Sequence, residues 1–347
     1  MNTVRVAVVG VGAWGQNHAR VYHQLPQAQL VAVADANAAR AAEVAAPLGT
    51  RAVSDYHDLL GEVDAVSVAV PTALHYEVAR EFLEAGVAVL LEKPMTRTVA
   101  EADELIALAG KRRVPLQVGH IERFNPVIRA MAELDITPKF IECQRLSPLS
   151  LRIQDVGVVF DLMIHDLDVV LHLVQAPIRK VDAVGVSVIS EHEDIANARI
   201  LFQTGCVANL TASRMSLRKV RRIRIFSPDS YISLDYDRKR GELYKASPLL
   251  RNLRLPIAGM KAETIADLRT VQFGDLLTIK EIEMDDAEPL RLELESFLDS
   301  VRSGTTPAVP GEQGRRAIAA AEQVLEAIRQ HRWEGWTDEA RPPEAKA

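Results

Sequence analysis

The sequence predicts an α/β chain in which a doubly wound parallel sheet is followed by an α+β domain with a large open, mostly antiparallel sheet. Over the first 119 residues, short apolar runs alternate with helix-length segments rich in Ala and Glu, as in parallel sheets buried on both faces. Between residues 180 and 244, strand-like runs follow one another with only turns between them, which is typical of antiparallel pairing. The length of 347 residues suits two domains.

The first domain is expected at residues 1–119. Strands are predicted where the residues are mainly small or β-branched, and helices where Ala and Glu dominate. Thr98 and Glu101 have the spacing of a capping box, which sets the start of one helix, and Gly86 marks the end of the helix before it. The predicted strands are 4–9, 30–34, 65–70, 87–91 and 116–118, and the predicted helices are 37–46, 74–85 and 99–108, besides one that opens at Gly15.

The second domain is expected at residues 120–335, and residues 336–347 are expected to form a disordered tail. Two helices are predicted at its start and two at its end, with Gly304 stopping the first of the closing pair. Residues 245–288 are polar and weakly periodic, so their secondary structure is the hardest to predict. The predicted helices are 126–134, 158–174, 289–303 and 311–330, and the strand-like runs are 181–190, 196–203, 206–213, 221–227 and 231–236.

The composition argues against membrane, secreted and nucleic-acid-binding proteins. No apolar run approaches the roughly 18 residues of a membrane span, and the amino end is too weakly apolar for a signal peptide. A net charge of -6 without a basic run argues against nucleic acid as the main partner. Two cysteines, Cys143 and Cys206, cannot form a disulfide framework. A cytoplasmic protein that binds neither membrane nor nucleic acid is therefore expected.

A glycine-rich turn after the first strand predicts a dinucleotide site. The segment 10–15 reads GVGAWG and opens the first helix. The first glycine permits a tight turn, the second lets the backbone approach a pyrophosphate, and the third allows close helix packing. This context identifies a Rossmann domain; the alternative is a glycine-rich turn beside a surface aspartate. The predicted cofactor-binding residues here are Gly10, Gly12, Ala13, Trp14, Gly15 and Asp35.

Asp35 predicts which dinucleotide is bound. It lies 20 residues after Gly15, at the end of the second strand, where a carboxylate accepts hydrogen bonds from the ribose hydroxyls. That carboxylate repels a 2′-phosphate, and residues 36–38 offer no arginine to hold one. NAD is therefore predicted as the cofactor, in preference to NADP.

The carboxyl edge of the predicted sheet receives two further segments, and open α/β sheets bind their ligands there. Pro71 and Thr72 follow one strand, and His75 lies one helical step beyond, either lining the nicotinamide pocket or acting as a capping or surface residue. Glu92 and Lys93 follow the next strand and are also predicted to meet the cofactor. A buried ammonium there would stabilise alkoxide character as a hydride leaves an alcohol.

The segment 161–168 carries the second set of candidate catalytic residues. In a helix, Asp161 and His165 stand one turn apart, and Asp168 and His172 continue the stripe. One interpretation is a metal site, which is disfavoured because no cysteine joins the group and hydride transfer to NAD needs no metal. A second is a structural set of paired or capping side chains. The favoured interpretation is general acid/base catalysis by His165, with Asp161 orienting it or sharing the proton.

Together these residues resemble the Gfo/Idh/MocA oxidoreductase family, which includes glucose–fructose oxidoreductase and inositol dehydrogenase. The motifs that carry the resemblance are GVGAWG at 10–15, VAVPTALH at 68–75, EKP at 92–94, DLMIH at 161–165, and GEQG at 311–314. The resemblance implies a Rossmann domain followed by an α+β domain whose open sheet commonly serves oligomerisation, giving a dimer or tetramer. It also implies that Lys93 and His165 lie closest to the reacting carbinol, with Asp161 beside them.

A narrower resemblance lies in GHIERFNP at 119–126 and DVGVVFDLMIHDLD at 155–168. These segments are similar to the members that oxidise the 3-hydroxyl of UDP-linked N-acetylhexosamines and so supply 3-keto sugars for amination and lipopolysaccharide precursors. UDP-N-acetylglucosamine is favoured over its uronic acid, because no arginine is evident for a carboxylate. Lys93, Asp161 and His165 would meet the sugar, joined by Arg123 and Asn125. Arg145 or Arg152 would meet the diphosphate or carry surface charge.

Two alternatives remain at this point. One is a dehydrogenase of the same family acting on a free polyol or aldose, such as inositol or glucose. The other is a non-catalytic sensor that binds NAD, which would have little reason to place Lys93 and His165 together.

Overall fold

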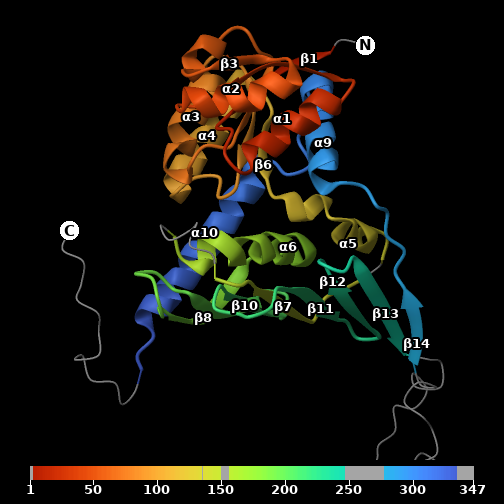
Figure 1. Cartoon of the computed structure of the whole chain (residues 1–347). Coiled ribbons are helices and arrows are strands. Elements are labelled where there is room, and N and C mark those ends of the chain that lie inside the picture. The colour runs from red at the N-terminus through yellow and green to blue at the C-terminus, as the bar shows by residue number, and fades with distance from the viewer. Residues whose placement is uncertain (1–2, 135, 150–155, 247–276, 334–347) are drawn as a thin grey trace, which may run out of the picture.

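The first domain contains a parallel six-stranded sheet. The computed structural model describes residues 3–134, 136–149, 156–246 and 277–333. The strands lie in the order β3-β2-β1-β4-β5-β6, and the prediction of a doubly wound parallel sheet is confirmed (Figure 1). The elements are β1 (Val4–Val9), α1 (Gly15–Gln24), β2 (Ala28–Ala34), α2 (Ala38–Ala45), β3 (Arg51–Val53), β4 (Ala65–Val68), α3 (Thr72–Glu84), β5 (Ala88–Glu92), α4 (Val99–Arg112) and β6 (Leu116–Gly119).

The predicted helix boundaries follow local chemistry. The Thr98 hydroxyl accepts a hydrogen bond from the Glu101 backbone N–H, and the Glu101 carboxylate accepts one from the Thr98 N–H, so the predicted capping box is present. Gly86 follows α3 with a φ of 79°, a left-handed conformation that glycine adopts without steric cost. In the first domain, strand β3 was not predicted, because two exposed residues and one half-buried residue leave no apolar run.

The second domain contains an eight-stranded sheet in the order β14-β13-β12-β11-β7-β10-β9-β8. Helices α6 and α10 cover one face of this sheet (Figure 1). Neighbouring strands pair antiparallel except β7 with β10, which are parallel, so the prediction of a mostly antiparallel sheet is confirmed. The strands are β7 (Phe140–Leu146), β8 (Ile178–Val186), β9 (Ile195–Phe202), β10 (Val207–Ser213), β11 (Val220–Phe226), β12 (Ser230–Asp235), β13 (Arg240–Ala246) and β14 (Leu277–Glu281).

The helices of the second half differ from the prediction at two places. The helix expected over 126–134 is a short α5 (Pro126–Arg129) followed by a 3-10 turn, η4 (Ala130–Glu133). The helix expected over 158–174 begins as a π-helical turn, η5 (Val159–Met163), and continues as α6 (Ile164–Val174). The closing helices α9 (Pro289–Ser303) and α10 (Gly311–Gln330) have the predicted bounds. The expected tail at 336–347 lies outside the described residues.

Helix α9 returns to the first domain. Its buried residues Leu294, Phe297 and Leu298 share a core with strand β1 and helix α1, so a segment that follows the second sheet in sequence completes the core of the first. Helix α10 then runs between the domains, contacting both α4 and α6 (Figure 1). The two domains are thus joined by packed helices, and this arrangement fixes the orientation of the carboxyl edge of the parallel sheet toward α6.

Candidate active site

The glycine turn has the geometry that a dinucleotide site needs. Gly10 has a φ of 84°, and a Cβ there would lie 2.6 Å from the Val70 backbone nitrogen. A Cβ on Gly15 would lie 1.9 Å from the Gly10 carbonyl oxygen, whereas one on Gly12 would meet nothing within 4 Å. The backbone at Gly12 is therefore open at the amino end of α1, where a pyrophosphate is favourably held.

Asp35 connects this turn with helix α2. Its Oδ2 accepts a hydrogen bond from the Val11 N–H at 3.0 Å, and its Oδ1 accepts one from the Asn37 N–H at 2.9 Å. The carboxylate is thereby fixed at the end of β2, beside the glycine turn. Its position fits the predicted role of meeting the ribose of the cofactor.

Glu92 forms a buried polar cluster below the edge of the sheet. Its Oε1 accepts hydrogen bonds from Trp14 Nε1 at 2.8 Å and lies 3.0 Å from His18 Nε2. Burial raises the pKa of the Glu92 carboxyl, but the hydrogen bonds of His18 and Trp14 outweigh it and leave that pKa below its ordinary value. Trp14 and Glu92 thus join α1 to the end of β5, and their predicted contact with the cofactor stays a prediction.

Sequence reasoning missed Glu293, which comes from α9 and lies near this cluster. Neither of its carboxylate oxygens has a hydrogen-bond partner among the described residues. Burial and the charge of Glu92 raise the pKa of Glu293 well above its ordinary value. A single glutamate in an amphipathic helix carries no sequence signal for such a role.

His75 connects the two segments at the carboxyl edge. The side chain is buried, with Nδ1 2.8 Å from the Pro94 carbonyl oxygen and Nε2 2.9 Å from the Val70 carbonyl oxygen. Burial lowers the pKa of this imidazole. His75 is therefore not a surface residue, and it holds the segments carrying Lys93 and Pro71 beside each other. Pro71 directly precedes α3, which begins at Thr72.

Lys93 reaches from the first domain to the second. Its Nζ donates a hydrogen bond to the Asp161 backbone oxygen at 2.9 Å and lies 3.9 Å from Asp161 Oδ1. Burial lowers the pKa of this ammonium, while the charges of Asp161 and Glu92 oppose that shift. Lys93 and Asp161, two of the three predicted catalytic residues, are thus brought together across the domain boundary.

His165 lies one turn after the residue that Lys93 contacts. Its buried Nδ1 has no hydrogen-bond partner among the described residues. Burial, and then the positive charges of Lys93 and Arg145, lower the pKa of His165 well below its ordinary value. The imidazole is therefore neutral at pH 7 and able to accept a proton.

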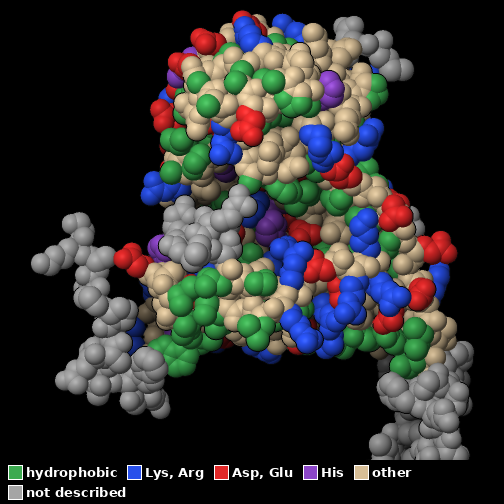
Figure 2. Space-filling view, viewed as in Figure 1, with side chains coloured by type: hydrophobic (Ala, Val, Ile, Leu, Met, Phe, Trp, Pro, Cys, Tyr) green, Lys and Arg blue, Asp and Glu red, His purple; other side chains and the backbone are tan. Residues whose placement is uncertain are grey.

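His120 was not predicted, although it follows β6 at the same edge of the sheet. It is buried, neither ring nitrogen has a partner in the described part of the chain, and burial lowers its pKa. Figure 2 shows a hollow between the two domains in which a histidine lies beside basic and acidic side chains. The position of His120 after an apolar strand, alongside Lys93, is the signal that could have identified it.

Arg145 has neither of the two roles considered for it. It is fully buried in β7, with Nε and Nη2 donating to the two Asp166 oxygens at 2.9 and 2.8 Å and Nη1 donating to Glu122 at 2.9 Å. The prediction of surface charge or diphosphate binding is therefore wrong for Arg145, because Asp166 and Glu122 hold its guanidinium on three sides. Arg152 lies outside the described residues.

Arg123 and Asn125 are held by other protein groups in this structure. Arg123 Nη1 lies 3.5 Å from Asp168 Oδ1, and Nη2 donates to Gln313 at 2.7 Å. The Asn125 side chain caps α5 by accepting from the Val127 N–H and donates to Glu122. Their contact with a sugar stays a prediction.

Two family models match the chain. The model of an oxidoreductase family with an NAD-binding Rossmann fold matches residues 4–120, and the model of the GFO/IDH/MocA carboxyl-terminal domain matches residues 147–230. Together they match the first domain and part of the second. The chain belongs to the Gfo/Idh/MocA family of oxidoreductases. Its first domain is the NAD-binding domain of that family, as the glycine turn predicted.

Relatives within the Gfo/Idh/MocA family cover nearly the whole chain. A UDP-N-acetylglucosamine 3-dehydrogenase of Acidithiobacillus ferrooxidans is 38% identical over 94% of this chain and 97% of its own length. A solved structure of that dehydrogenase matches with a TM-score of 0.83, covering 94% of this chain and 98% of the other. A scyllo-inositol 2-dehydrogenase (NAD(+)) of Bacillus subtilis is 27% identical over 88% of each chain.

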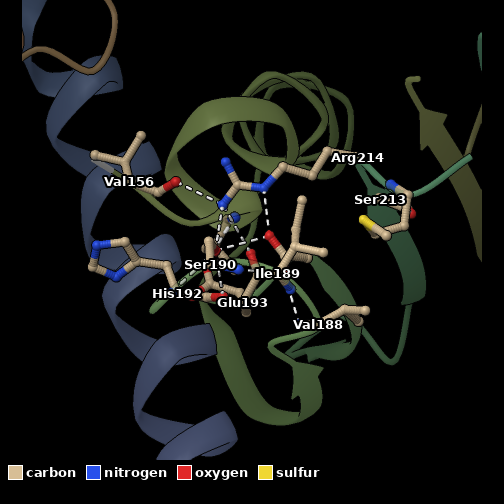
Figure 3. Close-up of polar contacts among 11 residues, drawn as sticks. Val156, Val188, Ile189, Ser190, His192, Glu193, Ser213 and Arg214 are labelled. Carbon is tan, nitrogen blue, oxygen red and sulfur yellow. Dashed lines mark hydrogen bonds and ion pairs between the residues drawn. The ribbon is translucent and has the colours of Figure 1, made fainter. Parts of the chain in front are cut away.

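In this Gfo/Idh/MocA chain a buried ion pair fixes the start of the helix that carries Asp161 and His165. Asp194 Oδ1 accepts from Arg214 Nε at 2.9 Å, and Oδ2 accepts from the Val188 and Ile189 N–H groups at 2.7 Å. Arg214 also donates to the Val156 carbonyl oxygen (Figure 3). The neighbouring Glu193 accepts a hydrogen bond from the Val159 N–H at the first residue of η5.

Two classes of feature are not found in the part of the chain that the structure describes. None of its helices combines the length and the apolar character required to cross a bilayer. No three His, Cys, Asp or Glu side chains there gather as the ligands of a metal ion.

Proposed function

We propose that this chain is an NAD-dependent dehydrogenase of UDP-linked N-acetylhexosamines that oxidises the sugar C3 hydroxyl to a ketone, with UDP-N-acetylglucosamine as the favoured substrate. The observation that carries the proposal is the contact between Lys93 and Asp161, one turn before His165. Support for the substrate comes from the near full-length likeness to the Acidithiobacillus ferrooxidans enzyme. We place the reaction in the cytoplasm, in the supply of 3-keto sugars for amination and lipopolysaccharide precursors.

In the proposed reaction the alcohol loses a hydride from C3 and a proton from its hydroxyl group. The glycine turn and Asp35 would hold NAD, with Pro71, Thr72 and Lys93 beside its nicotinamide, and bound NAD would supply the acceptor for the hydride that leaves C3. Neutral His165 accepts the hydroxyl proton. The Lys93 ammonium donates a hydrogen bond to the same oxygen and stabilises the negative charge that develops on it. Asp161 keeps Lys93 in place through its backbone oxygen.

A panel of substrates and cofactors tests this proposal. Purified protein is assayed for NADH formation with UDP-N-acetylglucosamine, its uronic acid, inositol and glucose, each with NAD and with NADP. We expect turnover with UDP-N-acetylglucosamine and NAD, and weaker turnover with NADP because Asp35 repels its 2′-phosphate. Turnover of inositol or glucose without turnover of the nucleotide sugars would refute the substrate, and a preference for NADP would refute the role of Asp35.

The polyol alternative has one observation in its favour, namely the inositol dehydrogenases among the relatives. The assay of NADH formation with inositol in the same panel decides between this alternative and the nucleotide sugar. The sensor alternative predicts NAD binding without turnover of any substrate.

A further inference from the structure

A polar cavity of about 370 Å³ lies where α10 crosses α6, beside η3 (Ile121–Phe124). Its titratable lining residues are Arg123, Asp168, His172 and Arg316, and Gln175 and Gln313 add side-chain amides. The Arg123 side chain at its floor is only 7% exposed, whereas Arg316 is exposed. The mechanism proposed above leaves Arg316, His172 and Gln313 without a role.

The charges around this cavity favour an anion. Asp168 is its single carboxylate, and Asp168 Oδ1 lies 3.5 Å from Arg123 Nη1. Burial and the nearby positive charge of Arg316 lower the pKa of Arg123, although Asp168 opposes them. Burial and Arg123 lower the pKa of His172. Two arginines held near each other with one counter-charge leave an excess positive charge, and planar guanidinium donors suit phosphate oxygens.

The cavity is separate from the region expected to hold the phosphates of NAD. Those phosphates belong at the glycine turn after β1, and the ribose at the end of β2. In the sheet order β2-β1-β4-β5-β6, Lys93 follows β5 and Arg123 comes after β6. The cavity therefore lies beyond Lys93, on the side opposite Asp35.

The distance from the reacting group suits a sugar joined to a phosphate. His165, Asp168 and His172 follow one another along one face of α6, and seven residues of helix span about 10 Å. In a nucleotide sugar the diphosphate is bonded to C1, two ring carbons from C3. When C3 lies at His165, the diphosphate must lie within one or two helical turns, which is where the cavity is.

We propose that this cavity is the diphosphate subsite of the nucleotide-sugar substrate, with Arg123 and Arg316 as the phosphate-binding residues and Gln313 holding Arg123 in place. The proposal rests on the proposed function, since it assigns part of the same substrate. It also gives the chain a reason to prefer a UDP-linked sugar over a free sugar or polyol.

Binding of UDP alone tests the subsite without any turnover. The affinity of the NAD-saturated protein for UDP is measured by calorimetry in the wild type, in Arg316→Gln and in Arg315→Gln. Arg315 is the matched control, because it neighbours Arg316 on α10 but pairs with Asp103 at the surface. We expect Arg316→Gln to weaken UDP binding about tenfold or more and Arg315→Gln to leave it unchanged. Equal affinity in all three proteins, or no binding of UDP to the wild type, would overturn the proposal.

A second measurement needs no variant. Inorganic pyrophosphate is titrated against UDP on the NAD-saturated wild type, and we expect it to displace UDP. Failure to compete would place UDP elsewhere and overturn the subsite. The outcome is separable from the proposed reaction: arginine-dependent UDP binding without oxidation of UDP-N-acetylglucosamine would refute the reaction and keep the subsite. If Arg316→Gln oxidised UDP-N-acetylglucosamine with an unchanged KM, the subsite would be refuted and the reaction would stand.

Discussion

Burial controls the protonation of the side chains that we propose to face the reacting alcohol. The pKa values of His165, His120 and Lys93 are all lowered, and in each case burial is the largest cause. A lowered pKa keeps an imidazole neutral at pH values where an exposed histidine, with a pKa near 6.5, is protonated. The site is thus built to keep a proton acceptor available in weakly acidic solution.

This leads to a prediction for the pH dependence of the reaction. If His165 accepts the proton, kcat/KM should hold its plateau as the pH falls through the ordinary range of histidine and decline only below it. The profile of kcat/KM against pH, measured with UDP-N-acetylglucosamine under saturating NAD, checks this. An acidic limb centred at or above pH 6.5 would argue against a neutral, buried His165 as the acceptor.

Replacing the two reactive side chains tests their roles one at a time. We expect Lys93→Met and His165→Ala each to reduce kcat by about 10²- to 10⁴-fold, the usual contribution of acid/base groups, with little change in NAD affinity. The measurements are steady-state turnover and fluorescence titration with NADH. Arg315→Gln serves as the control for mutation away from the site. Wild-type turnover in both variants would remove the catalytic assignment.

The sequence predicts site residues that follow a strand or lie in a motif. It does not predict residues whose position depends on tertiary packing. Lys93 and Asp161 are brought together as predicted, since Lys93 lies in the EKP motif and Asp161 in the DLMIH motif. Arg145 could not be placed, because an arginine becomes a core residue only through partners distant in sequence, here Glu122 and Asp166. Glu293 was missed because the packing of α9 against the first domain buries it, and that packing joins segments distant in sequence.

At the scale of elements, most strands and helices follow from local patterns, and the exceptions have physical causes. Strand β7 was missed because its sequence FIECQRL alternates buried and half-buried positions and includes charged residues on both faces. Its place at the middle of the sheet comes from pairing with β10 and β11. The π-helical turn η5 was missed because its start is held by Glu193 and the Asp194–Arg214 pair, which lie beside the ends of the later strands β9 and β10.

The Asp194–Arg214 pair gives a prediction for stability. Although burial acts to raise the pKa of Asp194, hydrogen bonds from the Ile189, Val188 and Ser190 N–H groups lower it to about 2. A carboxyl with a depressed pKa stabilises the folded state above its unfolded pKa, and that contribution is lost as the pH falls through the folded value. We expect Asp194→Asn to lose about 2 kcal/mol of unfolding free energy at pH 6.

The measurement for Asp194 is urea unfolding of the wild type and Asp194→Asn between pH 6 and pH 2.5. The difference between them should shrink as the pH falls below about 4, because the wild-type carboxylate then gains a proton in the unfolded state. A difference that is constant over this range would mean that the charge of Asp194 does not stabilise the fold.

For the whole molecule, the face of the second sheet opposite α6 and α10 suggests how copies of the chain assemble. An aromatic ladder of Phe140, Phe226, Tyr231 and Tyr244 crosses four strands, with ring centroids 4.7 to 5.6 Å apart. In the described part of the chain, α6 and α10 lie on the other face of this sheet (Figure 1). The four rings are half-buried, and apolar patches that are open to solvent commonly mark interaction sites.

We therefore predict a dimer or tetramer that forms through this sheet face. Light scattering coupled to gel filtration should give the mass of two or four chains, and Tyr231→Glu should shift it toward a single chain. Arg315→Gln, on a helix away from the ladder, should leave the mass unchanged. A wild-type protein that is monomeric at all concentrations would contradict the prediction.

The central claim is that two domains bring Lys93 and His165 to the C3 carbinol of a nucleotide sugar, beside the nicotinamide. The most direct test uses UDP-N-acetylglucosamine that carries deuterium at C3, incubated with NAD and the full chain, with mass spectrometry of the reduced cofactor. We expect the NADH formed to carry the deuterium, and its formation to be lost in His165→Ala. Unlabelled NADH, or none from this sugar, would contradict it.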